Sequence, residues 1–277
     1  MRQDARDREP DRYMAALLAP PRVRADLSAI AAFAATIGRI AHQVREPMMG
    51  EIRLQWWRDV LAAPSPTDRT GHPVADALID VIARHALPAE PFERFIDAHG
   101  FDLSGDLLAD DDALDGYLAT TEGLVFGLGV AVLAGPDRAA HAGLRSAGIA
   151  YGLARALGRL PETLQRGPFI IPKSRLAAAG IDPAALEQRP IAPEIAARLD
   201  TISRGLELRA RAALDEARAQ LIDLQPSALP ALLPLAMVEP YFAAQNRRGY
   251  RRLEHAADPT PLTRVWRMWR AHRGGRF

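Results

Sequence analysis

The feature that most constrains the fold is the spacing of apolar residues, which recur every three or four positions along most of the chain. The pattern is clearest in residues 193–223, where one helix face carries Ile195, Leu199, Ile202, Leu206, Ala213, Ala217 and Leu221. Arginine and acidic residues fill the other faces, as in an amphipathic helix that packs on a core. We find no stretch that alternates apolar and polar residues as a half-buried strand does. The sequence therefore predicts an all-α protein.

Composition supports this fold class. Alanine and leucine dominate, hydrophobic residues make up 48% of the 277 positions, and charged residues make up 25%. These are ordinary globular values, and alanine and leucine are strong helix formers. Prolines and glycines divide the chain, and 63–73 reads as a loop. The other predicted helices cover 22–43, 74–86, 89–98, about 111–133, 137–160, 227–254 and a short final segment.

Charge and cysteine content exclude several classes of function. The chain has 35 Lys and Arg against 34 Asp and Glu, a formal charge of +1 that does not favour nucleic acid. It has no cysteine, which excludes disulfides, thiolate metal sites and a cysteine nucleophile.

The N-terminal stretch lacks the apolar core of a signal peptide, and the apolar run 124–135 is short for a membrane span. We expect a cytoplasmic protein, with peripheral contact to the inner membrane left open.

Two stretches resemble the squalene/phytoene synthase family. They are residues 16–61, which contain GEIRLQWWRD, and residues 117–182, and the resemblance extends over roughly 13–253. It implies one domain over 1–277, an isoprenoid-synthase-like helical bundle around a central cavity. Residues 254–277 would then be a basic, aromatic tail. Within the first stretch, Trp56 and Trp57 point about 100° apart on a helix, so we expect one to pack inward.

Catalytic members of this family condense two prenyl diphosphates head to head, and the resemblance implies two aspartate-rich motifs for that reaction. Mg²⁺ neutralises the diphosphate leaving group and needs hard oxygen ligands. Where the first motif has its aspartates, this chain has Gly38, Arg39 and His42. We expect His42 to be either a structural histidine or a general base or ligand.

The second motif is altered in the same way. Its positions are occupied by Arg155, Gly158, Arg159 and Thr163, with Glu162 as the one acid retained beside the last. Arginine has no lone pair for a metal and repels Mg²⁺. We therefore expect no bound metal and no cofactor, with Mg²⁺ required only if the chain is an active prenyltransferase.

An earlier aromatic pattern of the family survives as Tyr117, and Glu122 introduces a carboxylate at the expected cavity wall. Arg39, Arg155 and Arg159 would then converge on the cavity and bind an anion through their guanidinium groups. The alternative is that Arg39 pairs with Glu122 or Glu162 in an obsolete site.

The missing aspartates are typical of a divergent branch of the family, which includes a mitochondrial complex I assembly factor. This likeness implies a non-catalytic protein that binds a lipid, an isoprenoid or an anionic small molecule, or assists the assembly of respiratory complex subunits. An atypical prenyltransferase remains the alternative. In the tail, residues 264–277 place arginines and tryptophans three positions apart, a pattern that fits peripheral contact with an anionic membrane or docking on the domain.

Overall fold

The computed structural model describes residues 2–62, 67, 69–165, 170–186, 188, 190–224, 226–247 and 250–277. Every element in these ranges is a helix, so the all-α prediction is confirmed. Most of the predicted loop 63–73 lies outside the described residues. The α-helices are α1 (Arg2–Arg8), α2 (Pro10–Leu18), α3 (Arg24–Ile37), α4 (Ile40–Gln43), α5 (Pro47–Ala62), α6 (Pro73–His85), α7 (Glu90–Gly100), α8 (Asp111–Leu118), α9 (Leu124–Ala134), α10 (Gly143–Gly158), α11 (Leu160–Gln165), α12 (Lys173–Ala178), α13 (Pro193–Gln220), α14 (Leu229–Leu232), α15 (Val238–Gln245) and α16 (Pro261–Gly274).

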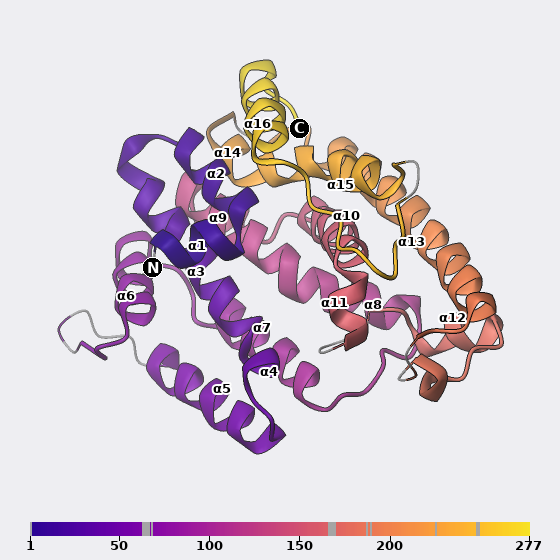
Figure 1. The fold of residues 1–277 in the computed structure, drawn as a ribbon. Helices are drawn as coiled ribbons and strands as arrows, with labels where there is room; N and C mark the ends of the chain where they lie inside the picture. The colour runs from indigo at the N-terminus through magenta and orange to yellow at the C-terminus, as the bar shows by residue number, and fades with distance from the viewer. Residues whose placement is uncertain are drawn as a thin grey trace.

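Helix α10 occupies the middle of the bundle. It packs along the 28-residue α13 on one side and against α15, α8 and α9 on the others. Helices α1–α3 lie on the opposite side of the molecule from α13, with α5 at the lower edge and α16 at the top (Figure 1). Buried side chains form two apolar clusters, one around α10, α13 and α15 and the other around α3, α6, α7 and α9.

Residues 111–134 form one continuous helical rod with a π-helical turn, η3 (Ala119–Gly123), between α8 and α9. Asp110 caps its start, because the carboxylate accepts a hydrogen bond from the Ala113 N–H at 2.9 Å. Gly135, at φ +97°, ends it in a conformation that favours glycine. The rod is long and apolar enough to cross a membrane, but most of its apolar window is buried inside the protein.

Three predicted helices are wrong in extent. The predicted helix 22–43 breaks after Ile37, and its last turn is the separate helix α4. The predicted helix 227–254 breaks into α14, the 3₁₀ segment η7 (Leu233–Met237) and α15, and it ends at Gln245. Pro230 and Pro234 lack the N–H that a continuous helix needs, so each starts a new segment. The predicted helix 137–160 begins only at Gly143. Leu160–Gln165 forms the separate helix α11, with Pro161 in its first turn, where proline is tolerated.

The two ends of the chain are joined by Asp11, which is 1% exposed. Its carboxylate accepts hydrogen bonds from Tyr151 at 3.0 Å, from Tyr241 at 2.7 Å and from Arg264 Nε at 2.7 Å. Met268, on the same helix as Arg264, is also fully buried. Buried residues thus extend beyond 13–253 at both ends, because α2 and α16 pack on the bundle.

Candidate functional site

A cavity of about 580 Å³ opens between the N-terminal helices and α10, so the predicted central cavity is present. The structure brings every candidate residue from the motif comparison except Gly158 to its wall. These are Gly38, Arg39, His42, Tyr117, Glu122, Arg155, Arg159, Glu162 and Thr163. Apolar side chains, among them Phe95, Leu118 and Val125, complete the lining.

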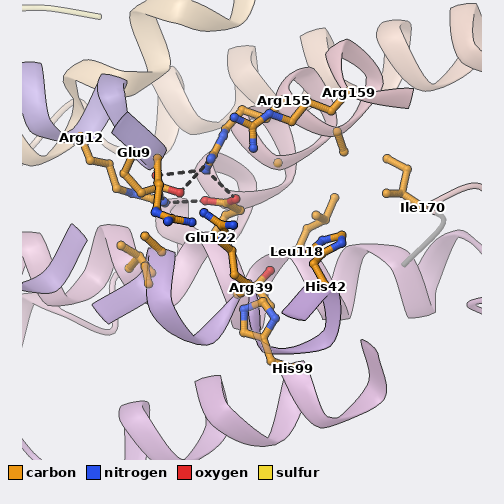
Figure 2. Close-up of a pocket in the computed structure, with 18 of the residues that line it drawn as sticks. Glu9, Arg12, Arg39, His42, His99, Leu118, Glu122, Arg155, Arg159 and Ile170 are labelled. Atoms are coloured by element: carbon orange, nitrogen blue, oxygen red, sulfur yellow. Dashed lines mark hydrogen bonds and ion pairs between the residues drawn. The ribbon is translucent and has the colours of Figure 1, made fainter. Parts of the chain in front are cut away.

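Glu122 lies at the centre of a cluster of two arginines and two glutamates (Figure 2). It accepts from Arg12 at 2.5 Å and from Arg155 at 3.1 Å. Glu9 accepts from the same two arginines, at 2.9 Å from Arg12 and at 2.8 Å from Arg155. The cluster, hereafter the Arg–Glu cluster, therefore carries no net charge.

Burial and ion pairing oppose each other in the Arg–Glu cluster. Desolvation alone would raise the pKa of Glu122, but the charges of Arg12 and Arg155 outweigh it and lower that pKa. The guanidinium groups of Arg12 and Arg155 each make a cation–π contact with Tyr151, at 5.2 Å from the centre of its ring. Tyr151 and Phe126 are thus buried behind the wall, beneath the arginines, and do not fill the cavity.

Arg39 and Arg159 differ from Arg155. Neither makes a side-chain hydrogen bond or ion pair with another residue that the structure describes. Glu122, one of the partners suggested for Arg39, is held by Arg12 and Arg155 instead, and Glu162 is exposed. Two cationic side chains therefore remain available at the wall, at the junction of α3 with α4 and at the end of α10.

The remaining predicted residues have more modest surroundings. His42 is exposed, and no described residue pairs with its ring. The Thr163 hydroxyl donates to the Leu160 carbonyl at 3.1 Å, a contact within its own helix. Gly38 follows the last residue of α3, and a side-chain carbon there would lie 3.5 Å from the ring of His99.

Sequence reasoning missed four polar residues of this wall or its support. Glu9 and Arg12, three positions apart, come from an N-terminal stretch that carried no motif. His99 and Asp102 also lie three apart, in the last turn of α7 and in the 3₁₀ turn that follows it, and their side chains are 2.7 Å from each other. Tyr117 donates to the same carboxylate at 2.9 Å. The i, i+3 spacing of each pair was the available signal.

Among the described residues no group of three or more His, Asp and Glu side chains is arranged to hold a metal ion. The acidic run at the start of α8 has other roles. Besides the cap at Asp110, Asp111 pairs with Arg175 at 2.6 Å, and Asp115 pairs with Arg209 at 2.6 Å. The hydrogen bond from Arg175 lowers the pKa of Asp111 despite partial burial.

Comparison with known proteins places this geometry in context. Complex I assembly factor 6 from mouse is 24% identical over 176 residues, which are 64% of this chain and 53% of that protein. The human protein is 23% identical over 167 residues, 60% of this chain and 50% of its own length. The chain thus spans about half the length of the curated relatives it matches.

Solved structures show the same fold. Squalene synthase HpnC from Alicyclobacillus acidocaldarius superposes with a TM-score of 0.72 at 21% identity, covering 90% of this chain and 93% of that one. A dehydrosqualene synthase in complex with ligand gives 0.76 at 14% identity, covering 99% and 94%. The profile of the Squalene/phytoene synthase family matches residues 5–270. The chain belongs to the squalene/phytoene synthase family.

Proposed function

We propose that this protein binds an anionic amphiphile, a lipid or isoprenoid with a phosphate or diphosphate head, without the metal-dependent condensation of the family's synthases. The observation that carries the proposal is the pair Arg39 and Arg159, whose side chains lack described partners on a wall that is otherwise partly apolar. Guanidinium groups bind phosphate oxygens in a planar, two-pronged geometry. The apolar lining would accommodate the chain of the ligand.

The carboxylates of the cavity support binding without a metal. Glu9 and Glu122 each contact two guanidinium groups, so a cation at these oxygens would be repelled by Arg12 and Arg155. Asp7 and Glu162, the other acids of the wall, are exposed. The residues present therefore do not fit a Mg²⁺ clamp, and we derive no step through the metal.

We expect the purified protein to bind farnesyl diphosphate in the presence of EDTA. Arg39→Ala and Arg159→Ala should each weaken binding about tenfold, because a hydrogen bond to a charged group contributes roughly 1.5–3 kcal/mol. Isothermal titration calorimetry measures the affinity. Arg145→Ala is the matched control, since Arg145 is exposed on the same helix as Arg155 and lies outside the cavity.

Two results would contradict this function. Turnover of farnesyl diphosphate in the presence of Mg²⁺ would make the chain a prenyltransferase. Unchanged affinity in both arginine variants would place the ligand elsewhere. Mass spectrometry of lipids that copurify with the wild-type protein would identify the natural ligand and its head group.

The likeness to complex I assembly factors suggests the setting in which the ligand is used, and we place the protein in respiratory complex assembly. In a deletion strain, wild-type protein should restore the abundance of complex I on native gels. The Arg39→Ala/Arg159→Ala double variant should not restore it, whereas Arg145→Ala should. Unchanged complex I after deletion would contradict the assembly role and leave ligand binding intact.

Helix α16 supports peripheral attachment to a membrane. Arg264 and Met268 face the bundle and are buried. The opposite face is apolar and exposed, with Leu262 at 82%, Trp266 at 51% and Trp269 at 47%. Arginines flank this face: Arg267 and Arg270 lie 5.5 and 5.4 Å from the Trp266 ring, and Arg273 lies 5.1 Å from Trp269. Indole rings beside guanidinium groups suit an anionic lipid surface.

We expect cosedimentation with vesicles that contain anionic phospholipid and much weaker binding to neutral phosphatidylcholine. Trp266→Ser/Trp269→Ser should reduce binding at least about tenfold, since burying one large apolar side chain contributes roughly 1.5–3 kcal/mol. Leu208→Ser, at a 68% exposed position on α13, is the control and should bind as wild type. Equal binding by the double variant would mean that this face contacts something other than lipid.

A further inference from the structure

His99 has the most constrained ring of the histidines on the cavity wall. It lies in the last turn of α7, and its Nδ1 lies 2.7 Å from Asp102 Oδ2. Tyr117 donates to the other oxygen of that carboxylate at 2.9 Å. The side chains of His99 and Asp102 are 11% and 3% exposed, so solvent contributes little to their solvation. His99, Asp102 and Tyr117 form the unit that we call the His–Asp–Tyr unit.

The proton positions in this unit follow from its chemistry. Burial and the neighbouring Asp102 raise the pKa of Tyr117 well above its ordinary value, so the phenol keeps its proton and donates. Nδ1 of His99 faces a carboxylate and therefore carries a proton. The second ring nitrogen, Nε2, has no hydrogen-bond partner among the described residues and is the site at which the ring gains or loses charge.

Nε2 of His99 lies beside Gly38, the residue before Arg39 in the chain. A side-chain carbon on Gly38 would lie 3.5 Å from His99 Cε1 and 3.8 Å from Nε2, so glycine leaves this edge of the ring uncovered. His99 and Arg39 both line the cavity. An anion held by Arg39 would therefore meet the imidazole edge of His99.

The charges around His99 decide which form of the ring suits an anion. With a neutral ring, Asp102 leaves the His–Asp–Tyr unit with a net negative charge, which repels an anion. With an imidazolium ring, the unit is neutral and Nε2–H becomes a donor. Glu122 also acts on the ring electrostatically, but Arg12 and Arg155 balance its charge and that of Glu9. Arg39 approaches from the α3 side and Tyr117 from α8.

We propose that His99 is an anion-binding residue of the cavity, and that a phosphate-type head group binds together with one proton on His99 Nε2. The inference rests on the proposed anion binding. It adds His99 to Arg39 and Arg159 as a third residue that contacts the anion. Asp102 and Tyr117 are positioning residues, because Asp102 holds the ring through Nδ1 and Tyr117 holds Asp102. Solvent or buffer gives up the proton that forms the Nε2–H bond, and no bond of the ligand forms or breaks.

Calorimetric titration with farnesyl diphosphate in buffers of different ionisation enthalpy tests the proposal. Wild type should take up more protons per ligand at pH 7.5 than His99→Gln. Its affinity should rise about tenfold between pH 8 and pH 6, because binding takes up a proton. His99→Gln should lose most of this rise. Asp102→Asn should reduce proton uptake, since it removes the carboxylate that holds the His99 ring in place.

His42→Gln is the matched control, because His42 lines the same cavity but is exposed and lacks a described carboxylate partner. It should retain the proton uptake and pH profile of wild type. Circular dichroism of His99→Gln and His42→Gln checks that both fold. Equal proton uptake by wild type and His99→Gln overturns this inference but not ligand binding. No binding of the diphosphate by wild type at any pH refutes both proposals.

Discussion

Asp11→Ala should cost about 3–5 kcal/mol in the free energy of unfolding, the range typical of a buried ion pair that loses one partner. Asp11 is the common acceptor for two tyrosines and an arginine that come from α10, α15 and α16. Without it, Arg264 keeps a buried guanidinium whose remaining carboxylate partner, Asp258, is 60% exposed. Denaturant unfolding, monitored by circular dichroism, measures the loss.

Two further variants separate charge from shape at this position. Asp11→Asn keeps an oxygen that accepts from the tyrosines but removes the charge opposite Arg264, so it should lose less stability than Asp11→Ala. Asp112→Ala, at an exposed aspartate of α8, should change stability by less than about 0.5 kcal/mol. A loss below about 1 kcal/mol in Asp11→Ala would mean that α16 is not fastened through this carboxylate.

Periodicity predicted the fold best where one helix face packs continuously on the core. Predicted helix 193–223 corresponds to α13, and predicted helix 111–133 corresponds to the rod from α8 to α9. Trp57 is 3% exposed and Trp56 is 37% exposed, which confirms that one of the pair packs inward. The method failed in 227–254, because apolar spacing continues through prolines that interrupt backbone hydrogen bonding.

The candidate site was only partly predictable, for a reason that lies in tertiary structure. The periodicity of apolar residues shows which face of each helix points inward. The motif positions that line the cavity wall could therefore be named. Their partners could not, because the Arg12–Glu122 contact joins residues 110 apart and the Arg155–Glu9 contact joins residues 146 apart. Of the three arginines predicted to bind an anion, Arg155 is neutralised within the Arg–Glu cluster, and only Arg39 and Arg159 remain without described partners.

The crossing of α10 with η3 depends on a contact that no pattern in the sequence revealed. A side-chain carbon on Gly148 would lie 2.5 Å from the Gly123 nitrogen and 2.9 Å from the Leu118 carbonyl oxygen. These are backbone atoms, which cannot rotate away as the end of a side chain can. Glycine at 148 therefore allows the two helices to touch, and this contact sets the distance between Glu122 and Arg155.

Gly148→Ala should destabilise the protein by about 3 kcal/mol, since overpacking typically costs 1–3 kcal/mol and here the clash involves backbone. It should also weaken binding of farnesyl diphosphate, because separating α10 from η3 pulls the Arg–Glu cluster apart. Gly116→Ala is the matched control. Nothing lies within 4 Å of a side-chain carbon at Gly116, in α8, so alanine should stabilise that helix by up to about 1 kcal/mol.

Thermal and denaturant unfolding of the two variants give shifts of opposite sign if this contact governs the crossing. Titration calorimetry then reports whether the cavity follows. Wild-type stability in Gly148→Ala would show that the helices separate without cost. Lost stability with unchanged affinity would show that the cavity keeps its geometry when the helices move. Both losses together would mean that the approach of Gly148 to Gly123 places Arg155 against Glu122 and thereby leaves Arg39 and Arg159 as the cations that face a ligand.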